Sequence, residues 1–323
     1  MHSTIDHLRE TIESELKAID VPSTPSNLYD PFRYILTLGG KRIRPILTLM
    51  GASLMGSDWK TAMPQAMAIE IFHNFTLVHD DIMDSAEVRR GLPTVHKKWD
   101  ENIGILSGDG MLVVAYQYLM KAPSEHLGKL ASVFSNTALE VCEGQQLDMD
   151  YAKRDVVPME EYLYMIRRKT AVLLGGAMQL GAIVAGANAE ELSKIQSFAE
   201  DMGLAFQIRD DYLDSFGDQE SFGKEIGGDI REGKRTWLTI KAMELANDVQ
   251  LNLLKDAYSS EDVEQRIKVV LDIYGQLDIA KHAQDAIQMY SSRSTESLDS
   301  INGEQVVKDQ LKGLVAALMG RTA

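Results

Sequence analysis

The chain of 323 residues contains a single cysteine, Cys142, so an internal disulfide and a zinc site made of several thiolates are both excluded. A single thiol is typical of a protein in a reducing compartment, and we expect this protein to be cytoplasmic. The apolar helical surroundings of Cys142 predict a small core residue. The first residues show no charged segment followed by an apolar one, so no signal peptide is expected.

Positive charge is also scarce. The formal net charge is −15 and the sequence pI is about 4.9, which argues against general binding to nucleic acid or to anionic membranes. One uncharged stretch, residues 171–189, is as long as a minimal membrane span. It contains four glycines and a central Gln179, so it is interpreted as a buried helix, and stable insertion into a membrane is not expected.

Strand patterns are nearly missing, because few runs alternate between apolar and polar residues. Helical spacing is common, as in the apolar series Ile5, Leu8, Ile12, Leu16 and Ile19. The segment 217–234 is rich in glycine and charge and is interpreted as an ordered functional loop. We therefore expect an all-α protein, one domain over residues 1–323, with its helices packed around a central cavity.

Three aspartates close one apolar helical run. Asp80, Asp81 and Asp84 follow residues 66–78, and the i, i+4 spacing places Asp80 and Asp84 on one helix face. Like charges this close repel each other, and an ionised carboxylate is costly to desolvate without a partner. A divalent cation would relieve both costs, and Mg²⁺ binds to one or two carboxylates together with phosphate oxygens. Taken alone, the motif is equally compatible with a solvated acidic helix end.

The same spacing recurs at the end of a second helical run. Asp210, Asp211 and Asp214 follow residues 195–208. Each acidic motif precedes a segment that contains glycine and basic residues. We interpret the two motifs as two walls of one metal site.

Basic clusters alternate with the acidic ones along the chain. They are GGKRIRP at residues 39–45, RRG at 89–91, KT at 169–170, GK at 223–224 and GKRT at 233–236. Cations and backbone amides near glycines can bind phosphate oxygens. This pattern in an acidic protein favours a ligand with two or more phosphates.

These motifs, together with FQIRDDYLD at residues 206–214, resemble the trans-isoprenyl diphosphate synthases of the polyprenyl synthetase family over about residues 30–240. The resemblance implies an antiparallel helical bundle in which the two acidic motifs face each other across a central cavity. It also implies a reaction. An allylic diphosphate loses pyrophosphate, the double bond of isopentenyl diphosphate attacks the allylic cation, and a proton is then lost. A homodimer is the expected assembly.

The resemblance also implies residue roles. Mg²⁺ ions, usually three, would be held by Asp80, Asp81, Asp84 and Asp210, and more weakly by Asp211 and Asp214. The allylic diphosphate would be contacted by Arg89, Lys169, Lys224 and Lys234. Isopentenyl diphosphate would be bound by Lys41, Arg44, His73 and Arg90. Thr170 and Gln207 would offer oxygen atoms to the developing cation, so Lys169, Thr170 and Gln207 are the expected catalytic residues. By spacing alone, His73 reads as an ordinary core histidine.

In this family the growing product extends down the cavity, past the residues that precede the first acidic motif. Phe75 lies five residues before Asp80, roughly 7 Å deeper at the rise of an α-helix. Its ring should block a long product, whereas the neighbouring Thr76 is small. The expected product is therefore a chain of twenty carbons first and fifteen second.

Two other interpretations remain open from the sequence. A class I terpene cyclase shares the fold and the first acidic motif, but its second motif usually mixes Asn, Ser or Thr with Glu. A non-catalytic subunit of a heteromeric synthase generally lacks one or both motifs. Consumption of isopentenyl diphosphate by the purified chain would separate all three.

Overall fold

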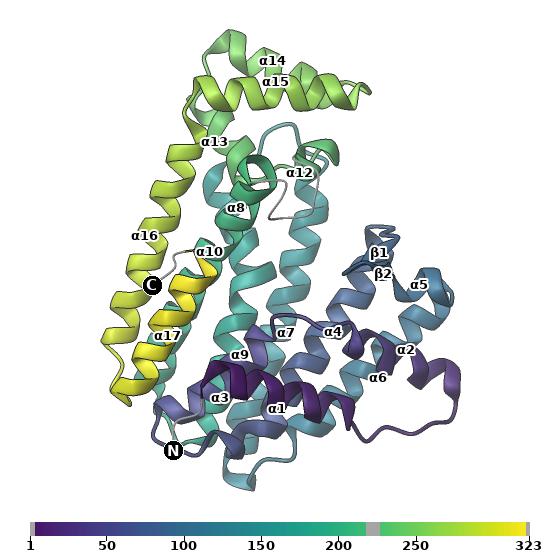
Figure 1. Ribbon diagram of the computed structural model, residues 1–323, viewed down its shortest axis with the longest axis vertical. Helices are drawn as coiled ribbons and strands as arrows, with labels where there is room; N and C mark the ends of the chain where they lie inside the picture. Colours follow the sequence, from purple (N-terminus) through teal and green to yellow (C-terminus); the bar gives the residue numbers. More distant parts are fainter. Residues whose placement is uncertain (1–3, 218–226, 321–323) are drawn as a thin grey trace. The chain divides into compact units, whose positions relative to one another are not determined.

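The computed structural model describes residues 4–217 and 227–320, and they are mainly helical, as predicted (Figure 1). The helices and strands up to residue 119 are α1 (Ile5–Lys17), α2 (Ser26–Thr37), α3 (Ile43–Leu54), the short 3₁₀-helix η1 (Trp59–Ala62), α4 (Met63–Met83), β1 (Val88–Arg89), β2 (Leu92–Pro93), α5 (Val95–Lys98) and α6 (Glu101–Leu119). Those that follow are α7 (Ser124–Tyr151), α8 (Met159–Ile166), the π-helix η2 (Arg167–Ala171), α9 (Val172–Val184), α10 (Ala189–Phe216), α12 (Gly228–Arg231), α13 (Trp237–Leu245), α14 (Asp248–Ser259), α15 (Val263–Gln276), α16 (Ile279–Asp299) and α17 (Gln305–Leu318).

The chain divides into two compact units. The first comprises Met1–Ser135, Gly176–Ser193 and Ile301–Leu311, and the second comprises Asn136–Gly175, Lys194–Ser300 and Lys312–Ala323. One domain over residues 1–323 stays a prediction.

In the first unit, α4 packs against α3 and α6, and α1 packs against α3. The middle of α4 is buried almost all round, which is why its sequence is apolar without a clear polar face. Helices α3 and α9 approach each other closely through glycines. A Cβ atom at Gly181 would lie only 2.8 Å from the carbonyl carbon of Thr48, so only glycine allows this contact.

A short hairpin follows α4, although strand patterns are nearly missing from the sequence. Strands β1 and β2 are antiparallel, with Val88 opposite Pro93 and Arg89 opposite Leu92. The two turn residues, Arg90 and Gly91, have positive φ angles of 54° and 79°. These are the angles of a type I′ turn, whose twist matches that of paired strands. The hairpin therefore fixes the positions of Arg89 and Arg90.

In the second unit, α8 continues without a break into η2, and α13 packs against α8 and α16. The hydroxyl of Ser294 in α16 donates a hydrogen bond of 2.9 Å to the carbonyl of Phe198, which ties α16 to α10. Helix α10 spans residues 189–216 and contains the helical run that the sequence predicted over residues 195–208.

The structure tests two predictions, one about Cys142 and one about the apolar stretch at residues 171–189. Cys142 was expected in the core, but it is exposed on α7, so that prediction is wrong. The apolar stretch around α9 forms a helix that stops at Val184. Within the residues that the structure describes, no helix is both long enough and apolar enough to cross a membrane.

Candidate active site

The first acidic motif occupies the C-terminal end of α4. The side chain of Asp81 is only 2% exposed and pairs with Arg89, whose Nε donates to both carboxylate oxygens at 2.8 and 2.9 Å. The side chain of Asp80 is 24% exposed, and Asp84 is exposed. Carboxylates at the C-terminal end of a helix oppose its dipole. The motif therefore breaks a local stability rule, as functional sites often do.

The second acidic motif lies at the C-terminal end of α10, and its middle aspartate is again the buried one. Asp211 is buried and accepts hydrogen bonds from the Tyr162 hydroxyl at 2.8 Å, from Nε2 of Gln207 at 2.9 Å and from the backbone N–H of Trp237 at 3.0 Å. Burial raises the pKa of Asp211 to about 7, although these donors oppose the rise. Asp210 and Asp214 are half-buried.

Helix α12 covers the end of this second motif. The backbone N–H of Asp229 donates to Oδ2 of Asp214 at 3.0 Å, and the N–H of Gly227 donates to the carbonyl oxygen of Asp214 at 2.8 Å. Only part of the Asp214 carboxylate is used in this way.

The middle aspartate of each motif is therefore bonded to protein groups, whereas the two outer ones keep exposed surface. Within the described residues, no group of three or more His, Cys, Asp or Glu side chains is arranged to hold a metal ion. Two aspartates with exposed surface in each motif suit Mg²⁺ better than a cation that needs all its ligands from the protein. Mg²⁺ takes few carboxylates and retains water and phosphate ligands.

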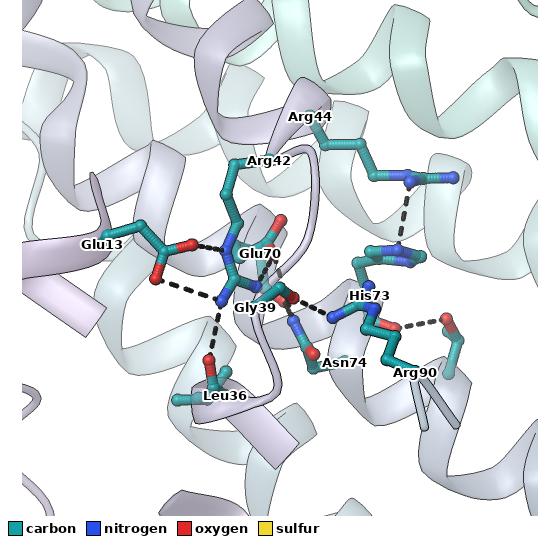
Figure 2. A network of polar contacts seen from close by, with 10 residues as sticks. Glu13, Leu36, Gly39, Arg42, Arg44, Glu70, His73, Asn74 and Arg90 are labelled. Atoms are coloured by element: carbon teal, nitrogen blue, oxygen red, sulfur yellow. Dashed lines mark hydrogen bonds and ion pairs between the residues drawn. The ribbon is translucent and has the colours of Figure 1, made fainter. Parts of the chain in front are cut away.

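A cluster of cationic groups lies in the first unit (Figure 2). One guanidinium nitrogen of Arg44 lies 3.1 Å from Nε2 of His73. Burial lowers the pKa of Arg44 to about 10, so its charge persists at neutral pH. Its buried Nε has no hydrogen-bond partner among the described residues. A buried, charged group with an unused donor is an expected feature of an anion-binding site.

His73 is neutral in this cluster. Its burial, and then the positive charges of Arg44 and Arg90, hold its pKa well below the usual value. A guanidinium group can only donate, so Nε2 of His73 accepts and Nδ1 carries the proton.

Arg90 approaches the same cluster from the β1–β2 turn. Its guanidinium donates to the carbonyl oxygen of Gly39, as Figure 2 shows. A Cβ atom at Gly40 would lie 3.0 Å from that guanidinium. Lys41 is exposed on the same loop. The four predicted isopentenyl diphosphate residues therefore all lie on or beside the loop of residues 39–44.

Lys169 and Thr170 lie in the π-helix η2, a rare type of helix that frequently occurs at functional sites. Nζ of Lys169 lies 2.5 Å from a carboxylate oxygen of Asp148. The Thr170 hydroxyl makes a long hydrogen bond of 3.5 Å to Oε1 of Gln207. Because Gln207 also donates to Asp211, the side chains of Thr170, Gln207 and Asp211 form one connected polar chain in the second unit.

Four predicted residues remain, and one of them lies outside the described residues. Lys234 pairs with Glu232 at 2.6 Å and with Asp229 at 3.7 Å. Lys224 lies outside the described residues. Phe75 is half-buried, with its ring 5.6 Å from that of Phe72 and 4.7 Å from that of His79. The Thr76 hydroxyl donates to the carbonyl of His73.

Three polar partners were missed by the sequence analysis. Tyr162 contacts the second acidic motif, and Asp148 contacts Lys169. Glu70 lies buried beside the cationic cluster. No motif marks the first two. Glu70 could have been noticed, because a glutamate inside the apolar run of α4 must have a partner.

Comparisons with known proteins identify relatives of this chain. The family model described as polyprenyl synthetase matches residues 25–274. The geranylgeranyl diphosphate synthase of Methanosarcina mazei is 38% identical over 301 residues, which cover 91% of each chain. A crystal structure of a geranylgeranyl pyrophosphate synthase is 46% identical, has a TM-score of 0.95 and covers 100% of each chain.

Another solved structure, with lower sequence identity, is of a complex with ligands. It is the geranylgeranyl pyrophosphate synthase of Corynebacterium glutamicum, in complex with isoprenyl diphosphate and magnesium. It is 26% identical, has a TM-score of 0.87, and covers 99% of this chain and 100% of its own. These similarities confirm the resemblance found in the motifs. The chain belongs to the polyprenyl synthetase family and is a trans-isoprenyl diphosphate synthase, an all-α short-chain prenyltransferase.

Proposed function

We propose that the chain joins isopentenyl diphosphate to an allylic diphosphate, head to tail, and releases a twenty-carbon prenyl diphosphate and pyrophosphate. The observation that carries this proposal is the division within the two acidic motifs. Each motif holds its middle aspartate in protein contacts and keeps exposed surface on the outer ones. Exposed carboxylates one helical turn apart are suited to hold Mg²⁺ against a diphosphate.

Asp80, Asp84 and Asp210 are the strongest candidates for Mg²⁺ ligands. Asp214 would contribute the part of its carboxylate that Asp229 does not use. Asp81 and Asp211 were predicted as ligands too, and their contacts favour a supporting role in which they orient Arg89 and Gln207. When bound, the Mg²⁺ ions, three by family pattern, would neutralise charge on the departing diphosphate.

The cationic cluster in the first unit would bind isopentenyl diphosphate. Arg44 has a buried charge and an unused donor, and His73 can offer its Nδ1–H. Arg90 would donate from the β1–β2 turn and Lys41 from the loop. The allylic diphosphate would be contacted by Arg89, Lys169 and Lys234, and by Lys224.

Thr170 and Gln207 would face the cation that forms when the allylic C–O bond breaks. The Gln207 amide has a defined orientation, because its NH₂ group donates to Asp211 and its oxygen accepts from Thr170. Preorganised oxygen dipoles stabilise a developing cation without reorganising. The double bond of isopentenyl diphosphate then attacks the cation, and the released pyrophosphate accepts the proton that is lost.

Phe75 would set the product length. Its ring is in contact with the rings of Phe72 and His79, and Phe72 in turn meets Phe134 edge to face, with ring centroids 5.3 Å apart. This aromatic row supports Phe75 from the side, so the ring cannot turn away easily. A blocked cavity favours the twenty-carbon product, and the geranylgeranyl synthases among the relatives support the same length.

A homodimer is part of the proposal. Leu106, Val113 and Met120 are 62%, 59% and 49% exposed and follow one another every seven residues along α6. Such a regular apolar row on an exposed helix face is unusual for a monomer and suits the same helix of a second copy. The single exposed thiol of Cys142 fits a reducing compartment, so we propose a cytoplasmic enzyme.

The metal roles are tested by Asp80→Asn and Asp210→Asn, with Asp256→Asn in the exposed part of α14 as a control. Each motif variant should lower turnover of isopentenyl diphosphate at least about a hundredfold and weaken Mg²⁺-dependent binding of pyrophosphate in calorimetry. Circular dichroism should stay unchanged. Near wild-type turnover in either motif variant would contradict the assignment. A chain that ionises an allylic diphosphate without consuming isopentenyl diphosphate would instead be a terpene cyclase.

A further inference from the structure

Arg42 lies between Lys41 and Arg44, two residues predicted to bind isopentenyl diphosphate, but its side chain points to other protein groups (Figure 2). Its side chain is 0% exposed. Its Nε lies 2.6 Å from a carboxylate oxygen of Glu13, and a terminal nitrogen lies 2.6 Å from a carboxylate oxygen of Glu70. The other terminal nitrogen donates to the carbonyl of Leu36 at 2.7 Å. These contacts use all three nitrogens within the protein.

The backbone at this position is unusual. Arg42 has φ 51° and ψ 34°, the left-handed conformation that residues with a Cβ atom rarely adopt. It is the residue that caps the start of α3, and Gly39 and Gly40 before it also have positive φ angles. A loop of this kind needs contacts that hold it in place. The buried guanidinium of Arg42 supplies them.

Glu70 connects this loop to the helix that carries His73. The Glu70 side chain is 3% exposed in α4, and Nδ2 of Asn74 donates to it at 3.3 Å. One turn further along the same helix lies His73, which contacts Arg44. The Arg42–Glu70 pair therefore fixes the start of α3 against α4, at the point where Arg44 meets His73.

Glu13 extends the network to the N-terminal helix α1. Its two carboxylate oxygens accept from Nε and from a terminal nitrogen of Arg42, at 2.6 and 3.5 Å. Burial disfavours the charge of Arg42, but Glu13 and Glu70 outweigh it, and the pKa of Arg42 is raised. The two carboxylates therefore compensate the positive charge of the buried Arg42 guanidinium.

We propose that Arg42 is a positioning residue for isopentenyl diphosphate binding, and that Glu13 makes the N-terminal helix part of that site. Arg42 holds the loop so that Lys41 and Arg44 face the diphosphate, and it does not touch the diphosphate itself. The proposal rests on the proposed function, since it assumes that Arg44, His73 and Arg90 bind isopentenyl diphosphate. A pair that only stabilised the fold would affect melting and leave substrate binding unchanged.

The test replaces Glu13 with glutamine, because Glu13 is 27% exposed and its loss leaves the Arg42–Glu70 pair intact. Glu10→Gln on the exposed side of α1 is the matched control, with the same change of charge. Glu13→Gln should raise the KM for isopentenyl diphosphate about threefold to tenfold. The KM for the allylic diphosphate and the kcat should change less than about twofold.

Two further variants complete the design. Arg42→Lys keeps the charge, but one ammonium cannot reach Glu13, Glu70 and the Leu36 carbonyl together, so the KM for isopentenyl diphosphate should rise further. Arg44→Met removes a proposed ligand. If Arg44→Met leaves this KM unchanged, the assigned diphosphate site is wrong. If Arg44→Met raises it while Glu13→Gln matches Glu10→Gln, the positioning proposal alone is refuted.

Discussion

A single methyl group at Gly144 should disturb the proposed catalytic residues Lys169 and Thr170. It lies in α7, against the backbone of the π-helix that carries Lys169 and Thr170. A Cβ atom at Gly144 would lie 2.6 Å from Cα of Lys169 and 2.7 Å from the carbonyl carbon of Arg168. Because these are backbone atoms, no side-chain rotation can make room.

The size of the effect follows from these distances. Ordinary contact for a Cβ atom begins at 3.4 Å, so Gly144→Ala must move α7 or η2 by at least about 0.8 Å. Overpacking of this kind typically costs about 1–3 kcal/mol of folding free energy. A shift near 1 Å in catalytic groups can cost about a hundredfold in rate. We therefore expect Gly144→Ala to lower kcat by about a hundredfold and to lower the Tm by several degrees.

Gly128→Ala is the matched control, in the same helix. A Cβ atom there would meet no described atom within 4 Å, so alanine should stabilise the helix by about 0.5–1 kcal/mol and leave kcat unchanged. The assay is steady-state consumption of isopentenyl diphosphate with an allylic diphosphate and saturating Mg²⁺, together with thermal melting. Equal kcat values for Gly144→Ala and Gly128→Ala would refute the reasoning.

Three other expectations concern the first unit. Gly181→Ala should lower the free energy of unfolding by about 1–3 kcal/mol in denaturant titrations, because its Cβ would press on the Thr48 carbonyl; an unchanged value would mean that α3 and α9 can separate freely. Phe75→Ala should lengthen the product in chromatography of the prenyl chains, and an unchanged length would place the floor elsewhere. His73→Gln should flatten the loss of stability on acidification. Below about pH 6.5 the unfolded wild-type chain binds a proton that folded His73 refuses, which costs up to about 1.4 kcal/mol per pH unit; parallel stability curves for wild type and variant would contradict a neutral His73.

The sequence was sufficient to predict the long helices. The helical run predicted over residues 195–208 is part of one helix over residues 189–216, because its apolar spacing is regular and no proline interrupts it. The β1–β2 hairpin was missed, since its turn is Arg90-Gly91 and the sequence offers none of the residue pairs that usually mark a type I′ turn. The π-helix at Lys169 was also missed, since nothing in the local sequence distinguishes it from α-helix.

The acidic residues could be found from the sequence, but the sequence does not show which of them are buried and which keep exposed surface. Spacing alone treats Asp80, Asp81 and Asp84 as similar carboxylates. The difference arises because Arg89 returns on the hairpin and binds to Asp81. In the same way, the burial of Asp211 depends on Tyr162, which lies far away in the sequence. Contacts between distant segments are decided by the packing of helices, which a local pattern does not contain.

The same limit applies to Arg42. Within the run of basic residues at 39–45 it looks like one more candidate for phosphate binding. Its actual partners, Glu13 and Glu70, come from two other helices. A motif therefore indicates which segment matters, whereas burial and partners decide which of its residues can meet a ligand.

The most direct test of the account is a product assay with the purified chain. The protein would receive Mg²⁺, radiolabelled isopentenyl diphosphate and allylic starters of five, ten and fifteen carbons in turn, and the products would be sized by chromatography. The account predicts Mg²⁺-dependent consumption of isopentenyl diphosphate and a main product of twenty carbons. A lack of consumption with every starter would contradict the proposed reaction, and a longer main product would contradict the role given to Phe75.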